Sequence, residues 1–327
     1  LVAGDVEALS GLLLRELPRF YDDVDHSFPA SLAAASAAER DEVGYFTIQK
    51  LIYIARHGGT PIGFTVASRK RGGSVKIGPT AVMAEWRGQG VATHLRDEAE
   101  QRLFADRGAR KLYLTVPANN LPALLFNLNR GFCIEAVLTD QYQEGRTELV
   151  MGRTEMRPPR AADRALNLRH APGKVRTEMI SDPPLEALVQ TFLEPLRQLF
   201  DGIDISFFRS ITEACKPERQ SYAAKGKRAI VGYYEEVPDA LCVYTPKRGG
   251  AVKLGPLVGR HVGAVESVLQ AAYECAKAEG RRKLYAHLPS PCWDMIKLLG
   301  RRGFVIEGQL REPYKPGVDV LVHGLTL

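Results

Sequence analysis

Residues 77–93, IGPTAVMAEWRGQGVAT, are the stretch that decides the fold of this chain. They join an apolar run typical of a β-strand to a turn, and the turn leads into an amphipathic helix that begins near Val91. Gly88 and Gly90 allow the backbone to turn tightly and to approach a ligand closely. The unpaired N–H groups at the start of the helix, with the positive end of the helix dipole behind them, favour phosphate oxygens. The stretch therefore predicts a pyrophosphate-binding turn and a nucleotide-like ligand.

The turn at residues 87–92, RGQGVA, resembles the Q/R-x-x-G-x-G/A motif of the GNAT superfamily of N-acetyltransferases. The surrounding sequence agrees with the family, because Val82 lies five residues before Arg87, and N-x-x-A followed by Gly131-Phe132 comes after a strand-like run, KLYLTV. Without this context, the turn would indicate only a tight strand-to-helix connection. The resemblance implies that the ligand is acetyl-CoA, or another acyl-CoA, as co-substrate, and it implies no metal.

The resemblance also implies which residues contact acyl-CoA. They are Val82, Met83, Ala84, Arg87, Gly88, Gln89, Gly90, Val91, Ala92, Thr93 and Asn120. The backbone N–H near Val82 or Met83 is the candidate donor to the thioester oxygen as charge develops on it. Asn120 is expected either to touch the pantetheine arm or to cap a helix at 120–129.

The sequence is a tandem repeat. Arg110-Lys111-Leu112-Tyr113 recurs as Arg282-Lys283-Leu284-Tyr285, a separation of 172 residues (110 to 282). Residues 71–79, RGGSVKIGP, match residues 248–256, RGGAVKLGP, at a separation of 177 (71 to 248). The second copy therefore lacks five residues between these two blocks. Each half of the chain is predicted to be a complete domain.

The expected fold class is α/β with a mixed α+β sheet, in two tandem GNAT-like domains that each have a twisted mixed β-sheet with helices on both faces. Residues 1–155 are expected to form the domain with the intact acyl-CoA motif, residues 156–173 an exposed basic linker containing proline, and residues 174–327 a degenerate copy. The elements predicted for the first copy are helices at 5–17, 91–107 and 120–129 and strands at 49–55, 61–68, 74–82, 111–116, 132–139 and 147–153. The resemblance implies that the loop after the first helix lines the acceptor side. In the second copy, a strand at 174–180 precedes a helix at 184–200. Only residues 1–4 precede the first copy's helix, so its opening strand is expected to be truncated.

The second copy has lost the glycine that the motif needs. At the separation of 172, Val262 stands where the first copy has Gly90. A β-branched residue resists a positive φ and blocks close approach of the backbone, so this loop is expected to hold pyrophosphate poorly. A shifted alignment would instead bring Gly259 or Gly263 into use.

The catalytic groups are harder to assign. The resemblance implies direct transfer from a thioester to an amine, with the family's acid a tyrosine, but Asn127 stands at that position and cannot donate a proton as an acid. Asp22, Asp23, Asp25 and His26 follow the first helix. His26, with Asp25 beside it, is the candidate base because its imidazole can accept a proton near neutral pH and the carboxylates attract a cationic amine. The alternative is a solvated acidic helix end.

Composition limits the other possibilities. The chain has 327 residues, of which 45% are hydrophobic, and a net charge of +6. The basic linker lacks the aromatic groups that stack on bases, so no nucleic acid is expected. Five widely spaced cysteines without a CxxC pair predict neither a disulfide framework nor a metal site. No run approaches the ~18 apolar residues that cross a bilayer, and no signal peptide is recognised, so a cytoplasmic protein without a membrane partner is expected.

The leading hypothesis is an acyl-CoA-dependent N-acyltransferase, acetyl-CoA being the simplest donor, that acts on a small-molecule amine. One working domain, the N-terminal one, would carry catalysis in a pseudo-dimer formed within one chain. Two alternatives remain open: N-acetylation of a protein or peptide, and a non-catalytic regulatory protein that binds acyl-CoA. The missing tyrosine favours the second of these.

Overall fold

The computed structural model describes residues 3–21, 24–37, 46–105, 108–154, 167–181, 183–216 and 226–327. Contacts divide the chain into two compact units. The first unit comprises residues 1–134 and 150–156, and the second comprises residues 135–149 and 157–327. The second unit thus includes a segment, 135–149, that the sequence repeat places in the first domain. No helix in the described part of the chain is both long and apolar enough to span a bilayer.

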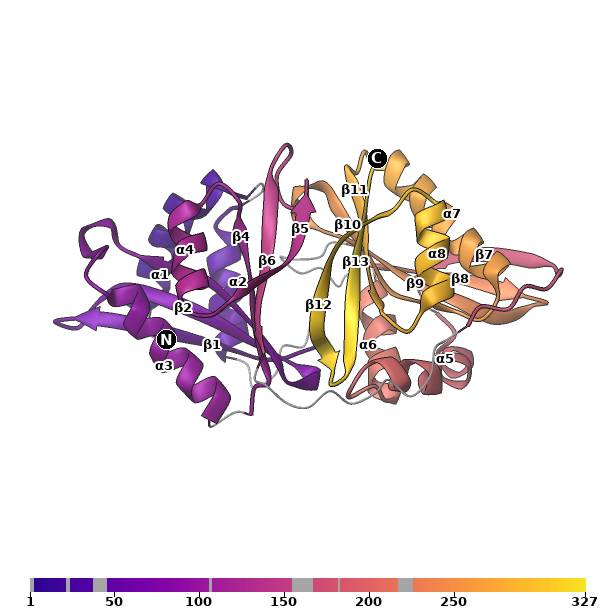
Figure 1. Ribbon diagram of the computed structural model, residues 1–327, viewed down its shortest axis with the longest axis horizontal. Helices are drawn as coiled ribbons and strands as arrows, with labels where there is room; N and C mark the ends of the chain where they lie inside the picture. Colours follow the sequence, from indigo (N-terminus) through magenta and orange to yellow (C-terminus); the bar gives the residue numbers. More distant parts are fainter. Residues whose placement is uncertain are drawn as a thin grey trace. The chain divides into compact units, whose positions relative to one another are not determined.

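The first unit begins with two helices, followed by three consecutive strands, a helix, a strand and a further helix (Figure 1). Its elements are α1 (Ala3–Glu16), α2 (Ser27–Ala37), β1 (Thr47–His57), β2 (Thr60–Lys70), β3 (Ser74–Val82), α3 (Val91–Ala105), β4 (Lys111–Pro117) and α4 (Leu121–Asn129). Two strands, β5 (Cys133–Thr139) and β6 (Thr147–Thr154), contain residues of both units. The strand order is β1-β2-β3-β4-β6. Strand β2 is antiparallel to both β1 and β3, whereas β3 and β4 are parallel.

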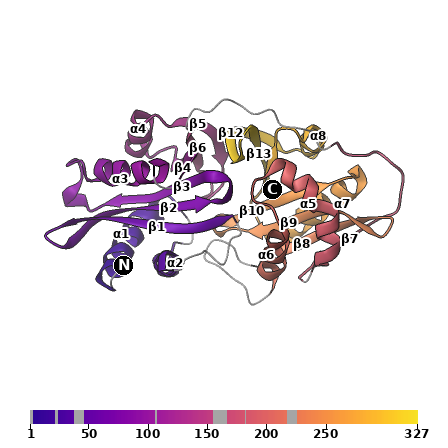
Figure 2. The ribbon, with the colours of Figure 1, turned by 90° about the horizontal axis from the view of Figure 1, so that it is seen from below.

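Helices cover both faces of this sheet. Figure 2 shows α3 and α4 on one face and α1 and α2 on the other. Because successive strand residues point to opposite faces, each face has its own apolar core. Phe64 and Val66 of β2 pack with Leu9, Leu12 and Leu13 of α1. The opposite core is formed by residues of β2, β3, α3, β4 and β6, among them Ala67, Ile77, Leu103, Leu112 and Met151.

Strands β3 and β4 pair over only part of their length. Their parallel register runs from Ser74↔Lys111 to Lys76↔Tyr113, although β3 continues to Val82 and β4 to Pro117. The pairing stops just before Gly78-Pro79, where the proline has no N–H to donate. The two strands therefore separate toward their carboxyl ends, directly before α3 begins.

The second unit repeats this order of elements. They are β7 (Val175–Ile180), α5 (Leu185–Leu199), α6 (Ile205–Cys215), β8 (Arg228–Tyr234), β9 (Val237–Pro246), β10 (Ala251–Gly259), α7 (Val262–Ala278), β11 (Lys283–Pro289), α8 (Trp293–Arg301), β12 (Val305–Lys315) and β13 (Val318–Thr326). The strand order is β12-β13-β11-β10-β9-β8-β7. Strands β10 and β11 pair in parallel only as far as Leu254↔Ala286, so they separate as β3 and β4 do.

Two expectations need correction. The loop expected after the first helix contains the helix α2, and its counterpart α6 follows α5 in the second unit. The carboxylate Oδ1 of Asp204 accepts hydrogen bonds from the N–H groups of Ser206 and Phe207 and so caps α6. Within the segment expected to be an exposed linker, Leu168 is an exception, because it is 7% exposed and belongs to the core of the second unit.

Candidate functional site

The glycine loop, residues 87–90, has the conformation that its sequence predicts. The φ angles of Gly88 and Gly90 are 74° and 81°, a region that residues with a side chain rarely adopt. A Cβ atom built on either glycine would meet no atom within 4 Å, so the loop borders open space. The first intrahelical bond runs from the N–H of His94 to the carbonyl of Gly90. The first N–H groups of α3 therefore have no intrahelical acceptor and are available to an anion.

Arg87, the first residue of this loop, is held in place by two side-chain contacts. Its Nε donates to the backbone carbonyl of Val82 at 3.1 Å, and its Nη2 lies 2.8 Å from Oε1 of Glu16 at the end of α1. Partial burial raises the pKa of Glu16, but the hydrogen bond and the charge of Arg87 outweigh it and leave the pKa below its ordinary value. Arg87 thus links α1, the end of β3 and the glycine loop. No sequence pattern singles out Glu16, apart from its place at the end of the first helix.

The structure separates the two candidate donors at the end of β3. The N–H of Met83 donates to the carbonyl of Ile62 at 2.9 Å, so it belongs to the sheet. Val82 pairs with Gly63 at a position where neither residue bonds to the other, which directs the N–H and C=O of Val82 away from β2. They face the side where β4 has separated. Val82 is therefore the better candidate, and Met83 is not one.

The remaining loop residues hold the turn in shape. Ala84 opens a short 3₁₀ turn over Ala84–Trp86, and the side chain of Gln89 donates to the carbonyl of Glu85 at 2.8 Å. The Trp86 ring packs against His57 at the end of β1, with 4.5 Å between ring centroids. Val91, Ala92 and Thr93 form the first turn of α3. The residues predicted to bind acyl-CoA between positions 82 and 93 thus lie in one continuous turn.

Asn120 and Asn127 both lie at α4. Asn120 caps this helix, since its Oδ1 accepts a hydrogen bond from the N–H of Ala123 at 3.3 Å. The cap uses the oxygen and leaves the Asn120 amide nitrogen as a possible donor. Asn127 is buried and linked at both ends, because its Nδ2 donates to the carbonyl of Ala123 at 2.8 Å and its Oδ1 accepts from Nη1 of Arg96 at 3.1 Å. Asn127 therefore connects α4 to α3.

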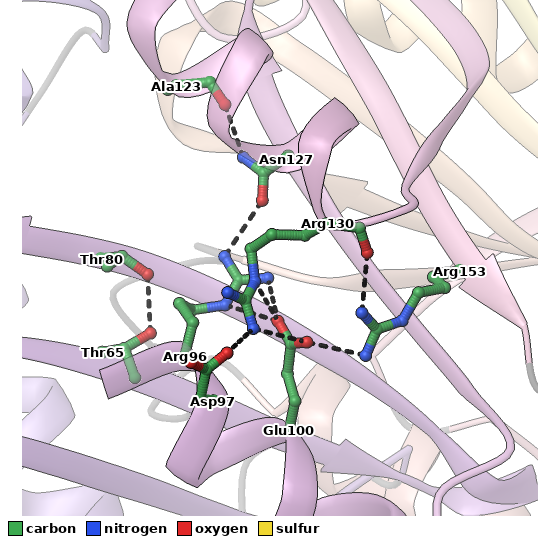
Figure 3. Close-up of polar contacts among 9 residues, drawn as sticks. All are labelled: Thr65, Thr80, Arg96, Asp97, Glu100, Ala123, Asn127, Arg130 and Arg153. Carbon is green, nitrogen blue, oxygen red and sulfur yellow. Dashed lines mark hydrogen bonds and ion pairs between the residues drawn. The ribbon is translucent and has the colours of Figure 1, made fainter. Parts of the chain in front are cut away.

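Around Asn127 lies a buried charge cluster, formed by Arg96, Glu100, Arg130 and Arg153 (Figure 3). Glu100 is 4% exposed, and its carboxylate lies 2.8 Å from Arg96 Nη2, 3.1 Å from Arg130 Nη2 and 2.7 Å from Arg153 Nη2. Burial raises the pKa of Glu100, yet the bond from Arg130 and the charges of the other two arginines hold it below its ordinary value. This cluster was not predicted from the sequence, although the i, i+4 spacing of Arg96 and Glu100 signals a pair on one face of α3.

The predicted catalytic pair lies at the start of α2. Asp25 is exposed, and its Oδ1 accepts the backbone N–H of Ser27 at 2.8 Å. This is the capping arrangement of Asp204 in the second unit, so the structure gives Asp25 a local role. His26 is exposed and makes no hydrogen bond or ion pair to the residues that the structure describes. Asp22 and Asp23 lie outside the described residues.

The second unit has no glycine loop. Eight residues separate β3 from α3, whereas only Arg260 and His261 separate β10 from α7. The alignment at 177 continues to the end of β10, so Gly259 corresponds to Val82 and not to a loop residue. A Cβ on Gly259 would lie 2.4 Å from a Val265 methyl, which makes it a packing glycine. Neither Gly259 nor Gly263, which lies inside α7, supplies a pyrophosphate-binding turn.

Residues 17–132, which include the glycine loop, match the family described as acetyltransferase (GNAT) family. This segment is a GNAT acetyltransferase domain. No curated protein is significantly similar to the chain. Among the described residues, no group of His, Cys, Asp and Glu side chains is arranged to hold a metal ion.

Solved acetyltransferase structures resemble about half of the chain. The Escherichia coli ribosomal-protein-S18-alanine N-acetyltransferase is 18% identical, with 48% of this chain and 93% of that chain covered at a TM-score of 0.39. Ard1 from Thermoplasma volcanium is 21% identical, with 48% and 95% covered at a TM-score of 0.40. An aminoglycoside 6'-N-acetyltransferase complexed with coenzyme A is 18% identical, with 47% and 92% covered at a TM-score of 0.37.

The glycine loop can be tested by charge. Gly90→Glu places a carboxylate beside the first N–H groups of α3, where it competes with pyrophosphate. We expect it to weaken acyl-CoA binding by at least about tenfold, or 1.4 kcal/mol, in a calorimetric titration. Gly108→Glu is the matched control, because Gly108 follows the other end of α3, has φ 60° and also borders open space. Equal affinities in the two variants would remove the loop from the binding site.

The charge cluster can be tested by stability. Glu100→Gln removes the carboxylate that three arginines share, and we expect a loss of about 3–5 kcal/mol in urea unfolding. Glu98→Gln, which breaks the exposed pair with Arg102 on the same helix, should cost at most about 1 kcal/mol. Because the folded-state pKa of Glu100 is lowered, its contribution is present above the ordinary carboxyl range and is lost as the pH falls through the folded-state value. The Gln variant should therefore lose less stability than the parent on acidification. Similar losses in both variants at neutral pH would contradict this role.

Proposed function

We propose that the first unit transfers an acyl group, acetyl in the simplest case, from acyl-CoA to the amine of a small molecule. The observation that carries the proposal is the glycine loop, in which two glycines at positive φ border open space and lead into the unpaired N–H groups of α3. The loop lies next to the point where β3 and β4 separate. A ligand with a pyrophosphate at one end and a long, narrow arm fits this combination.

The residues of this chain divide the work of binding and orienting the donor. The N–H groups from Gly88 to Thr93 would hold the pyrophosphate, and the amide nitrogen of Asn120, whose oxygen caps α4, would donate to the arm. The N–H of Val82 would donate to the thioester oxygen as negative charge develops on it. Acyl-CoA itself supplies the activated carbonyl and the thiolate leaving group. Arg87 fixes the Val82 peptide through its bond to the carbonyl.

The acceptor amine and its proton transfer are proposed to involve the exposed residues just before α2. An incoming ammonium must lose a proton before its nitrogen can attack, and His26 remains the proposed base. Its imidazole is exposed at the start of α2 and can meet a soluble amine. Asn127 takes no part in protonating the thiolate, because Arg96 and the carbonyl of Ala123 already engage its side chain. The thiolate would therefore take its proton from water or leave unprotonated.

A non-catalytic acyl-CoA-binding protein is the second candidate, and the engaged side chain of Asn127 favours it. The two are separated by mixing the protein with acetyl-CoA and a panel of small primary amines, with basic peptides in parallel, and following free thiol. Thiol release with a small amine, absent in Gly90→Glu, supports the proposed transfer. Binding without release for any acceptor supports the regulatory candidate, and release only with peptides supports protein acetylation. Absence of acyl-CoA binding would overturn the proposal.

His26 is tested by separating turnover from binding. If its imidazole removes the ammonium proton, His26→Ala should lower kcat by roughly 10²-fold or more and leave the affinity for acyl-CoA nearly unchanged. His170→Ala, an exposed histidine of the second unit, is the control and should change neither quantity. An unchanged kcat in His26→Ala would exclude it from the mechanism.

A further inference from the structure

A segment of the chain itself crosses the second unit at the place where the first unit has its glycine loop. This strap, residues 168–174, lies between the residues that the structure does not describe and the start of β7. At its beginning, the N–H of Leu168 donates to Oδ2 of Asp294 in the first turn of α8 at 3.0 Å. The strap is therefore fixed to the second unit before it continues into the sheet.

The side chain of Leu168 is buried where β10 and β11 have separated, beside residues at the ends of both strands. It lines an apolar cavity together with Leu199 of α5, Val258 and Gly259 of β10, and Cys292 before α8. Gly259 pairs with Ala240 as Val82 pairs with Gly63, so its N–H and C=O also face the separated strand. Leu168 thus enters the second unit at the position that corresponds to the thioester end of the site in the first.

The backbone of Arg169 forms hydrogen bonds with the short connection between β10 and α7. Its N–H donates to the carbonyl of Arg260 at 2.6 Å, and its carbonyl accepts the N–H of Val262, the first residue of α7, at 3.1 Å. Arg169 thereby forms a parallel bridge with His261. An N–H at the start of the helix, which would serve a phosphate in the first unit, is used here by a peptide carbonyl.

A buried carboxylate completes this arrangement. Asp239 is 1% exposed and accepts hydrogen bonds from Nε of Arg260 at 3.0 Å and from the backbone N–H of His261 at 2.8 Å. Its Oδ1 also lies 2.9 Å from Nδ1 of His261. Asp239 therefore fixes the two-residue connection before α7, whose backbone pairs with Arg169.

The end of the strap is held by Tyr234. The Tyr234 hydroxyl donates to the carbonyl of Pro172 at 2.9 Å, and its ring stacks on His261 with 4.0 Å between centroids. Gly173 allows this contact, because a Cβ there would lie 2.3 Å from the Tyr234 ring. The carbonyl of Lys174 then accepts the N–H of Glu235 at 3.0 Å, and the N–H of Lys174 donates to Oε1 of Glu235 at 2.9 Å.

We propose that the cleft of the second unit is a peptide-binding site whose resident ligand is the chain's own strap, residues 168–174. One apolar anchor, Leu168, enters the opening in the sheet, and the backbone of Arg169 pairs with the loop before α7. The strap occupies the place that acyl-CoA takes in the first unit, a comparison that rests on the proposed function. The second unit accordingly binds no acyl-CoA.

The reactivity of Cys292 can show whether the strap is bound, because Cys292 and Leu168 line the same cavity. Cys292 is 6% exposed, and burial raises its pKa to about 12, so it should react slowly with a thiol reagent in the folded protein. Leu168→Asp introduces a charge into the apolar cavity and should release the strap. We expect N-ethylmaleimide labelling of Cys292, mapped by mass spectrometry, to accelerate at least about tenfold. Labelling of Cys215 and Cys242, which are buried elsewhere, should stay at the parent rate.

His170→Ala is the matched control within the strap, since His170 is exposed, and it should leave Cys292 protected. Unchanged labelling of Cys292 in Leu168→Asp would overturn the proposal. If all three buried cysteines label together, the variant has unfolded, and residue-resolved hydrogen exchange of the parent decides. The N–H of Val262 should then be protected relative to that of Gly263, which has no intrahelical acceptor. Equal exchange at the two positions would overturn the proposal as well.

This readout does not depend on the proposed function. Labelling and hydrogen exchange are measured without acyl-CoA, so the strap can be confirmed in a protein that binds none. A calorimetric titration of the parent tests the proposed function separately, with one site per chain expected. Two acyl-CoA sites in the parent would contradict the strap as a resident ligand and leave the proposed activity of the first unit intact.

Discussion

The separation of β3 from β4 is the constraint on which the candidate site depends. If parallel pairing continued, the N–H and C=O groups of Val82 would bond to β4. The N–H could then not face a ligand, and the C=O could not accept the bond from Arg87. Pairing ends after Lys76 and Tyr113 because Pro79, lacking an N–H, follows closely. The opening lies directly before α3, so one local interruption of the sheet places a polar backbone position beside a helix start.

The two units resolve the same opening differently. A gap in a sheet exposes backbone groups and apolar surface that must be covered by something. In the first unit the connection before α3 is long and rich in glycine, and it leaves the helix start open to solvent. In the second unit the connection is reduced to Arg260 and His261, and the strap supplies a leucine side chain and a peptide group. In the second unit, the shortened connection and the strap together cover the opening.

The sequence predicted the parts of the fold that local pattern determines. Strand periodicity, the repeat at 172 and 177, and the positive φ of Gly88 and Gly90 all follow from short stretches of sequence. Helix α2 was missed because its apolar residues are mostly alanine, which gives little contrast between faces, although Asp25 two residues before its first serine is a capping signal. The partnership of Arg87 with Glu16 could not be predicted, since it joins residues 71 positions apart (16 to 87) through tertiary packing alone.

The charge cluster of the first unit also could not be predicted from local sequence patterns. Comparison with the second copy of the repeat shows which residues replace it there. At a separation of 172, the positions of Arg96, Glu100, Asn127 and Arg153 are occupied in the second unit by Val268, Ala272, Leu299 and Leu325. The first three are buried, and Leu325 packs against the same core. An apolar core therefore satisfies the fold at this place.

Buried ion pairs are seldom more stabilising than a well-packed apolar alternative, so stability alone does not account for the cluster. Only the unit with the glycine loop has it, and it fixes α3, whose first turn bears the N–H groups of the site, against α4, which Asn120 caps. The charged version therefore joins α3 to α4 through side-chain hydrogen bonds, which the apolar residues at the same positions of the second unit cannot form.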